Sequence, residues 1–230
     1  MVEDVLGVTG NVTFTEHENS STTIDIVLNN APSGTYSAYL CQNSAIEGGA
    51  VIATLNPLGK TGESSTLISN MSYDQLIAYD GHIKVLKSTS PEVILALGDI
   101  GGNEITETNI KSNLNLIEPF GVSGIVLFEK RANENTLVTI SLTGTIAGAS
   151  YPSTINLGSI ASIGGGPIVK TLNNVNGTSG KGYTNIRKLD NGTAITYDNW
   201  LVYLGYINIY QTSANIENII SQGDVGSNLK

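Results

Sequence analysis

The feature that most constrains this sequence is an internal repeat whose period is close to half of the chain. Residues 7–14 (GVTGNVTF) match residues 121–128 (GVSGIVLF), which lie 114 positions later, and residues 48–56 (GGAVIATLN) match residues 165–173 (GGPIVKTLN) at an offset of 117. Self-similarity over such a distance indicates that one structural module occurs twice. The sequence therefore predicts two copies of one module, each of ordinary domain size.

Two later matches keep the same order. Residues 73–74 (YD) match residues 197–198 (YD) at an offset of 124, and residues 98–101 (GDIG) match residues 223–226 (GDVG) at an offset of 125. Because the offset only grows, the second copy carries small insertions, most of them in the stretch after Leu172. Turn-forming Asn and Gly residues in that stretch indicate longer hairpin tips.

Each copy has the alternation that is typical of strands with one buried face. Apolar residues recur at every second position, namely Ile24, Ile26 and Leu28 in the first copy and Val138, Ile140 and Leu142 in the second. Such strands follow one another at short intervals, with Gly or Asn turns between them. This spacing predicts an all-β chain of two tandem Greek-key domains, each a β-barrel or an immunoglobulin-like sandwich.

The stretch between the two copies shows a weak helical spacing of apolar residues. We therefore expect a first domain over residues 1–105, a linker with at most one helical turn over residues 106–116, and a second domain over residues 117–230. Each predicted domain is long enough to bury a core of its own.

Charge and cysteine content restrict the classes of partner and site. Lys and Arg total 11 against 20 Asp and Glu, so the net charge is −9 and a nucleic acid would repel the chain. No apolar run approaches the ~20 residues that span a membrane, and no signal peptide follows Met1. Cys41 is the single cysteine, which excludes an intrachain disulfide and a multi-thiolate metal site.

Three segments of each copy resemble the chordin-type CHRD domain, a repeated β module of extracellular proteins that also occurs in bacterial secreted proteins and lipoproteins. The segments are residues 151–156 (YPSTIN), 205–210 (GYINIY) and 223–226 (GDVG) in the second copy, and 36–41 (YSAYLC), 81–86 (GHIKVL) and 98–101 (GDIG) in the first. The resemblance implies an extracytoplasmic protein that is secreted, periplasmic or held at the cell surface, with a lipid anchor upstream as one alternative.

The family's layout is similar to that of copper-zinc superoxide dismutase, so the resemblance implies a related β-barrel. Its histidine-like places hold Thr154, Asn156 and Tyr210 in the second copy and Tyr39, Cys41 and Leu86 in the first, while the chain has two histidines, His17 and His82. Copper and zinc need imidazole, thiolate or carboxylate ligands. We therefore expect no metal and no cofactor, although Thr154, Asn156 and Tyr210 should converge on one side of their sheet.

The repeated Gly-Asp turns offer a second set of candidate residues. Asp99 and Gly101 recur as Asp224 and Gly226, and a carboxylate that accepts backbone N–H groups would appear once per module. We predict structural turns here, with a calcium loop as the alternative. Cys41 lies in an alternating strand and is predicted to be a small buried side chain rather than a nucleophile.

Aromatic residues gather late in the second copy. Trp200, Tyr203, Tyr206 and Tyr210 could form a platform for a sugar ring or a partner protein, with packing beneath a loop as the alternative. No catalytic residues are predicted. The sequence thus favours a non-catalytic binding or structural module whose partner is a protein or a glycan at the cell surface. The alternatives are a carbohydrate-binding or calcium-dependent surface protein and, by fold analogy alone, a superoxide-dismutase-like metalloenzyme.

Overall fold

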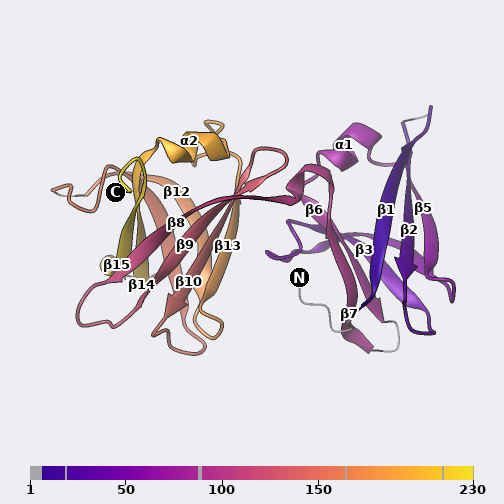
Figure 1. Ribbon diagram of the computed structural model, residues 1–230, viewed down its shortest axis with the longest axis horizontal. Coiled ribbons are helices and arrows are strands. Elements are labelled where there is room, and N and C mark those ends of the chain that lie inside the picture. The colour runs from indigo at the N-terminus through magenta and orange to yellow at the C-terminus, as the bar shows by residue number, and fades with distance from the viewer. Residues whose placement is uncertain (1–6, 19, 88–89, 164, 214, 230) are drawn as a thin grey trace. The chain divides into compact units, whose positions relative to one another are not determined.

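The computed structural model describes residues 7–18, 20–87, 90–163, 165–213 and 215–229. The chain divides into two compact units, Met1–Glu104 and Ile105–Lys230. Both are built from antiparallel strands, which confirms the all-β prediction (Figure 1). No helix in the described ranges is long and apolar enough to span a bilayer.

The first unit contains two separate sheets, with the strand orders β1-β2-β5 and β4-β3-β6-β7. Its elements are β1 (Thr9–Glu16), β2 (Thr22–Asn29), β3 (Tyr36–Gln42), β4 (Val51–Leu58), β5 (Glu63–Ile68), α1 (Tyr73–Ile77), β6 (Gly81–Lys87), β7 (Ser90–Asp99) and the short 3-10 helix η1 (Gly101–Asn103). Neither sheet is closed by a ladder to the other among the described residues.

The second unit is a closed barrel with the strand order β10-β13-β12-β11-β14-β15-β8-β9. Its elements are β8 (Ile105–Leu116), β9 (Ser123–Arg131), β10 (Thr136–Thr143), β11 (Ser150–Leu157), β12 (Ile168–Asn176), β13 (Lys181–Ile186), α2 (Tyr197–Leu201), β14 (Leu204–Thr212) and β15 (Asn215–Gly226). Each barrel strand except β8 corresponds to the strand numbered eight lower in the first unit. The order β9-β10-β13 thus matches β1-β2-β5, and β12-β11-β14-β15 matches β4-β3-β6-β7.

The prediction of a linker over residues 106–116 is wrong, because this stretch is strand β8. It pairs antiparallel with both β9 and β15. Ile110, Ser112 and Leu114 lie on its inner face, and Leu114 is part of the core of the second unit. The polar Ser112 in the middle of this face interrupts the alternation of apolar and polar residues, so the sequence does not show the pattern of a strand here.

The two units also agree in register. Val12 lies opposite Ile26 and Phe14 opposite Ile24 in the β1–β2 pair. The residues 114 positions later repeat these pairs between β9 and β10, as Val126 opposite Ile140 and Phe128 opposite Val138. A hydrogen bond between the fourth and fifth strands of each set repeats too, from the backbone N–H of Asn56 to Thr66 Oγ1 (2.8 Å) and from that of Asn173 to Thr184 Oγ1 (2.9 Å).

The repeated Tyr-Asp pair opens the short helix of each unit. Ser72 caps α1 by accepting from the backbone N–H of Gln75, whose side chain accepts from the N–H of Ser72. Asn199 likewise accepts the backbone N–H of Thr196 ahead of α2. Such a reciprocal arrangement is the capping box that starts a helix.

Ile26 and Ile140 are both about 1% exposed at the centre of the two cores. Replacing either with Ala should lower the free energy of unfolding by ~2 to 5 kcal/mol, because a buried cavity remains. The neighbouring Val27, whose side chain is 41% exposed, provides the control. Val27→Ala should cost only about 0.5 kcal/mol in the same urea titration. Equal losses at the two neighbouring positions would show that the buried face of β2 is assigned backwards.

Candidate functional site

The three histidine-like places of the second unit come together on the outer face of the barrel, the face opposite the core. Thr154 Oγ1 donates to Asn156 Oδ1 (2.7 Å) and lies 3.0 Å from the Tyr210 hydroxyl, to which Asn208 Nδ2 donates at 3.4 Å. Each of these four side chains is at most about 6% exposed. We call them the outer polar cluster. Their convergence is the arrangement expected from the sequence.

A long loop between β11 and β12 lies over this cluster. Asn156 Nδ2 donates to the carbonyl oxygen of Gly166 (2.9 Å), and the N–H of Gly166 donates to the Tyr206 hydroxyl (2.8 Å). The hydroxyl and amide groups are therefore mostly used within the protein, Asn208 Oδ1 being the atom without a described partner. The cluster works chiefly as an anchor for the loop.

The donor set of the outer polar cluster does not fit copper or zinc. Its members are two amides and two neutral hydroxyl groups, whereas these metals prefer imidazole and thiolate. Within the part of the chain that the structure describes, no three His, Cys, Asp or Glu side chains are grouped as metal ligands.

The equivalent face of the first unit holds a row of three residues from neighbouring strands. Cys41 lies opposite His82 across β3 and β6, and His82 lies opposite Asp99 across β6 and β7. His82 Nδ1 is 2.8 Å from the carbonyl oxygen of Asn43, so the ring N–H donates to the loop between β3 and β4, which covers this face. Sequence reasoning missed this row because its members are far apart in the chain.

Cys41 is fully buried, and burial raises the pKa of its thiol although the nearby Lys84 opposes the rise. The thiol therefore keeps its proton at neutral pH and is unreactive. Tyr39 and Leu86, the other two histidine-like places of the first unit, are half-buried. Leu86 lies opposite Ser37 rather than Tyr39 or Cys41.

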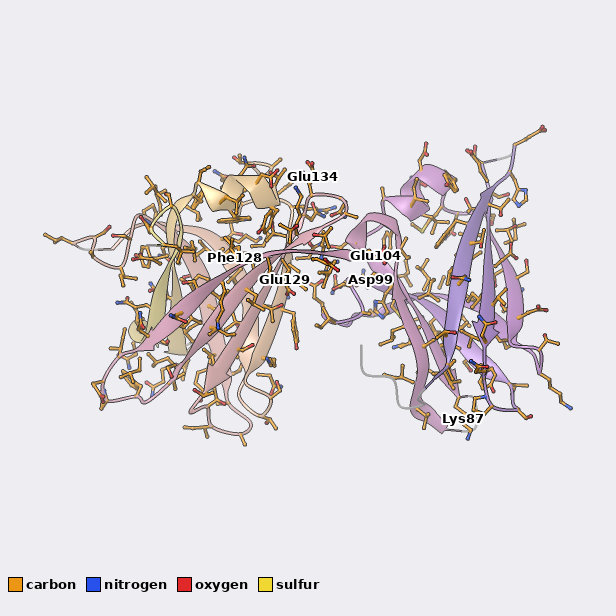
Figure 2. The ribbon with its side chains drawn as sticks, viewed as in Figure 1. Lys87, Asp99, Glu104, Phe128, Glu129 and Glu134 are labelled. Atoms are coloured by element: carbon orange, nitrogen blue, oxygen red, sulfur yellow. The ribbon has the colours of Figure 1, made fainter. Side chains whose placement is uncertain are left out.

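The repeated Gly-Asp turns hold equivalent backbone groups in the two units. Asp99, which is labelled in Figure 2, accepts the N–H of Ala45 through Oδ1 (2.7 Å). Asp224 Oδ1 accepts the N–H of Ile160 (2.9 Å). Gly101 and Gly226 adopt φ values of +49° and +62°, which favour glycine. A Cβ atom on Gly226 would lie 2.2 Å from the carbonyl oxygen of Tyr203.

Of the four aromatic residues predicted to form a binding platform, Trp200, Tyr206 and Tyr210 are buried and Tyr203 is half-buried. Trp200 is fully buried in the core, with its ring 5.5 Å from Phe128 and 4.9 Å from Tyr203 between centroids. Tyr206 and Tyr210 are 4% and 5% exposed on the opposite face. The covering loop and the core thus take up the surface that a sugar ring would need.

Sequence reasoning missed a groove in the first unit. It is an opening of about 250 Å³ between β1 and β7, lined by Val8, Val12 and Leu28 on one side and by Val85, Ala96 and Gly98 on the other. We call it the β1–β7 groove. Among the described residues β1 pairs only with β2, and β7 pairs only with β6. The groove therefore combines apolar side chains with two open sheet edges.

Comparison with known proteins finds no match from which a function could be transferred to this chain. No family model matches the sequence, and no curated protein matches it either. The likeness to CHRD domains thus rests on the three short segments of each copy. The β1–β7 groove and the outer polar cluster are the features from which function can be argued.

Asp99 and Asp224 should stabilise the fold through the backbone groups they accept. Asp99→Ala should lower the free energy of unfolding by roughly 1 to 3 kcal/mol because the N–H of Ala45 loses its acceptor. Asp99→Asn keeps an acceptor oxygen and should cost much less. A melting temperature that rises with calcium in the wild type, and no longer does so in Asp99→Asn, would assign a metal site instead.

The Cys41 thiol should react slowly with a disulfide reagent at pH 8 in the folded chain and rapidly in guanidinium chloride. Because folding raises its pKa, the unfolded chain loses this proton first. The free energy of unfolding should therefore fall as the pH rises above about 8.5. Cys41→Ala should remove that part of the slope, and an unchanged slope would show that Cys41 does not cause it.

Proposed function

We propose that this chain is a non-catalytic binding or structural module that works outside the cytoplasm. It consists of two tandem Greek-key copies of a chordin-type β module, and its partner is a protein or a glycan at the cell surface. The observation that carries the proposal is the β1–β7 groove. An apolar hollow between two open strand edges has the chemistry of a binding site.

The outer faces of both units support a role without catalysis. Their polar side chains anchor the covering loops through Tyr206 in the second unit and His82 in the first. The Cys41 thiol is buried beside His82 and has a raised pKa, which is the opposite of an activated nucleophile. The histidine-like places hold side chains that do not fit copper or zinc.

The groove favours a polypeptide over a glycan as partner. Its lining is dominated by Val, Leu, Ile and Ala side chains. Sugar recognition uses exposed aromatic rings and polar groups, whereas Trp200, Tyr206 and Tyr210 of the second unit are buried and Tyr203 is half-buried. The resemblance to CHRD domains supports the location outside the cytoplasm, with a lipid anchor upstream as one way of holding the module at a surface.

Nile red, a neutral apolar dye, tests whether the groove binds ligands. The dye should fluoresce with the wild-type chain at one saturable site. Ala96 faces the groove and is only half-buried, so Ala96→Leu should fill the opening and remove most of the fluorescence without lowering the melting temperature. Leu67→Gln changes a 60% exposed apolar side chain elsewhere in the same unit and should have no effect.

Equal dye binding by wild type and Ala96→Leu would contradict the groove as the site. The carbohydrate or calcium alternative would be favoured by a different result on a glycan array. There the chain would bind a glycan, a calcium chelator would abolish the binding, and Ala96→Leu would leave it unchanged.

A further inference from the structure

We infer that the β1–β7 groove takes one extended strand of a separate polypeptide, inserted antiparallel to both β1 and β7. This inference rests on the proposed binding function and specifies its partner. The strand would carry aliphatic or small side chains at every second position. Insertion would turn the first unit into the arrangement that the second unit already has.

The same place in the second unit is filled by β8. This strand pairs along β9, with Ile110 opposite Phe128, Ser112 opposite Val126 and Leu114 opposite Gly124. Its other edge pairs with β15, where Leu116 lies opposite Ser221. The counterparts of β9 and β15 in the first unit are β1 and β7, the two strands that flank the groove.

Strand direction explains why β1 and β7 need an inserted strand rather than each other. β9 and β15 are both antiparallel to β8, so they run parallel to one another. By the same order, β1 and β7 would have to pair as parallel strands to close the first unit directly. One strand that is antiparallel to both provides hydrogen-bond partners for both edges at once.

A pair of equivalent glycines gives independent evidence. A Cβ atom on Gly223 would lie 2.1 Å from the carbonyl oxygen of Asn113 in β8, so the passage of β8 requires glycine there. The equivalent residue in the first unit is Gly98. A Cβ atom on Gly98 would have no neighbour within 4 Å, and its φ is not one that favours glycine. Gly98 therefore leaves room for a strand backbone that no described residue of the first unit supplies.

The core residues beside the groove show the same difference. Val126 and Phe128 are at most about 1% exposed beneath β8, whereas the equivalent Val12 and Phe14 are only half-buried. Ser221 is fully buried and donates to the carbonyl oxygen of Asn115 in β8 (2.9 Å). Its equivalent, Ala96, is half-buried in the groove.

The register of β8 defines the partner segment. Three inward side chains would face Phe14, Val12 and Gly10, with the largest room opposite Gly10, as Leu114 lies opposite Gly124. Side chains between them would point to solvent and can be polar, as Asn113 and Lys111 are in β8. A peptide with the sequence of Ile105–Leu116 is therefore a suitable probe.

The experiment titrates this peptide, labelled with fluorescein, with the full 230-residue chain and follows its anisotropy. We expect saturable binding of one peptide per chain. Gly98→Val should weaken it by about tenfold or more, since a clash of ~1.4 kcal/mol is enough for that change. The melting temperature of Gly98→Val should equal that of the wild type, whereas Gly223→Val should lower it.

Two controls keep the test specific. Gly59 also has no neighbour within 4 Å of a Cβ position and lies away from the groove, so Gly59→Val should leave peptide binding unchanged. A peptide with Leu114→Asp would place a charge against the core and should not bind.

Several results would overturn the inference. Absent peptide binding would exclude a strand as the occupant, while dye binding that Ala96→Leu abolishes would still support a binding function. Loss of both would remove the proposed function as well. Chain dimers in sedimentation that Gly98→Val dissociates would assign the groove to a second copy. An equal loss of stability in Gly98→Val and Gly223→Val would show that the groove is already filled.

Discussion

The pairing of β8 with both β9 and β15 is the interaction on which the second unit depends. It supplies hydrogen-bond partners to two edges and places Leu114 in the core. It also explains the glycine at position 223, because the backbone of β8 passes too close for any side chain. The first unit repeats the strands on either side of this position, and none of its described residues forms a strand between them. Its open groove follows directly from that difference.

The outer faces of the two units show how one framework holds different loops. In the second unit Tyr206 accepts the N–H of Gly166, and in the first unit His82 donates to the carbonyl oxygen of Asn43. Asp224 and Asp99 accept a backbone N–H from the same two loops. The residues that most suggested chemistry in the sequence are thus tied to the backbone. Function is better sought where polar edges and apolar side chains remain open.

Much of the fold could be predicted from the repeat and from the alternation of apolar residues. Ile26 and Ile140 were recognised as core residues because each lies in a strand with a strict period of two. β8 was missed because Ser112 occupies the central inward position and because its partners β9 and β15 both follow it in the chain. Its second partner, β15, is distant in the chain, and such a pairing leaves little local signal.

The candidate sites were harder to predict for the same reason. Tyr206 and Tyr210 were expected to face away from Ile207 and Ile209, but alternation cannot show that a loop covers that outer face. Trp200 was grouped with them by sequence proximity, although α2 directs it into the core. The β1–β7 groove arises because no described strand pairs with the outer edge of β1 or of β7. Its one local sign in the described sequence is the glycine at position 98, which no described contact requires.

Amide hydrogen exchange of the free chain tests the central claim, that the first unit is an open form of the second, most directly. Residues 10–15 of β1 are compared with their equivalents, residues 124–129 of β9, which have a partner strand on both sides. In β1, amides that point away from β2 should exchange quickly, while the equivalent amides of β9 should be protected by β8. Equal protection of the two segments in the absence of any added peptide would contradict the account.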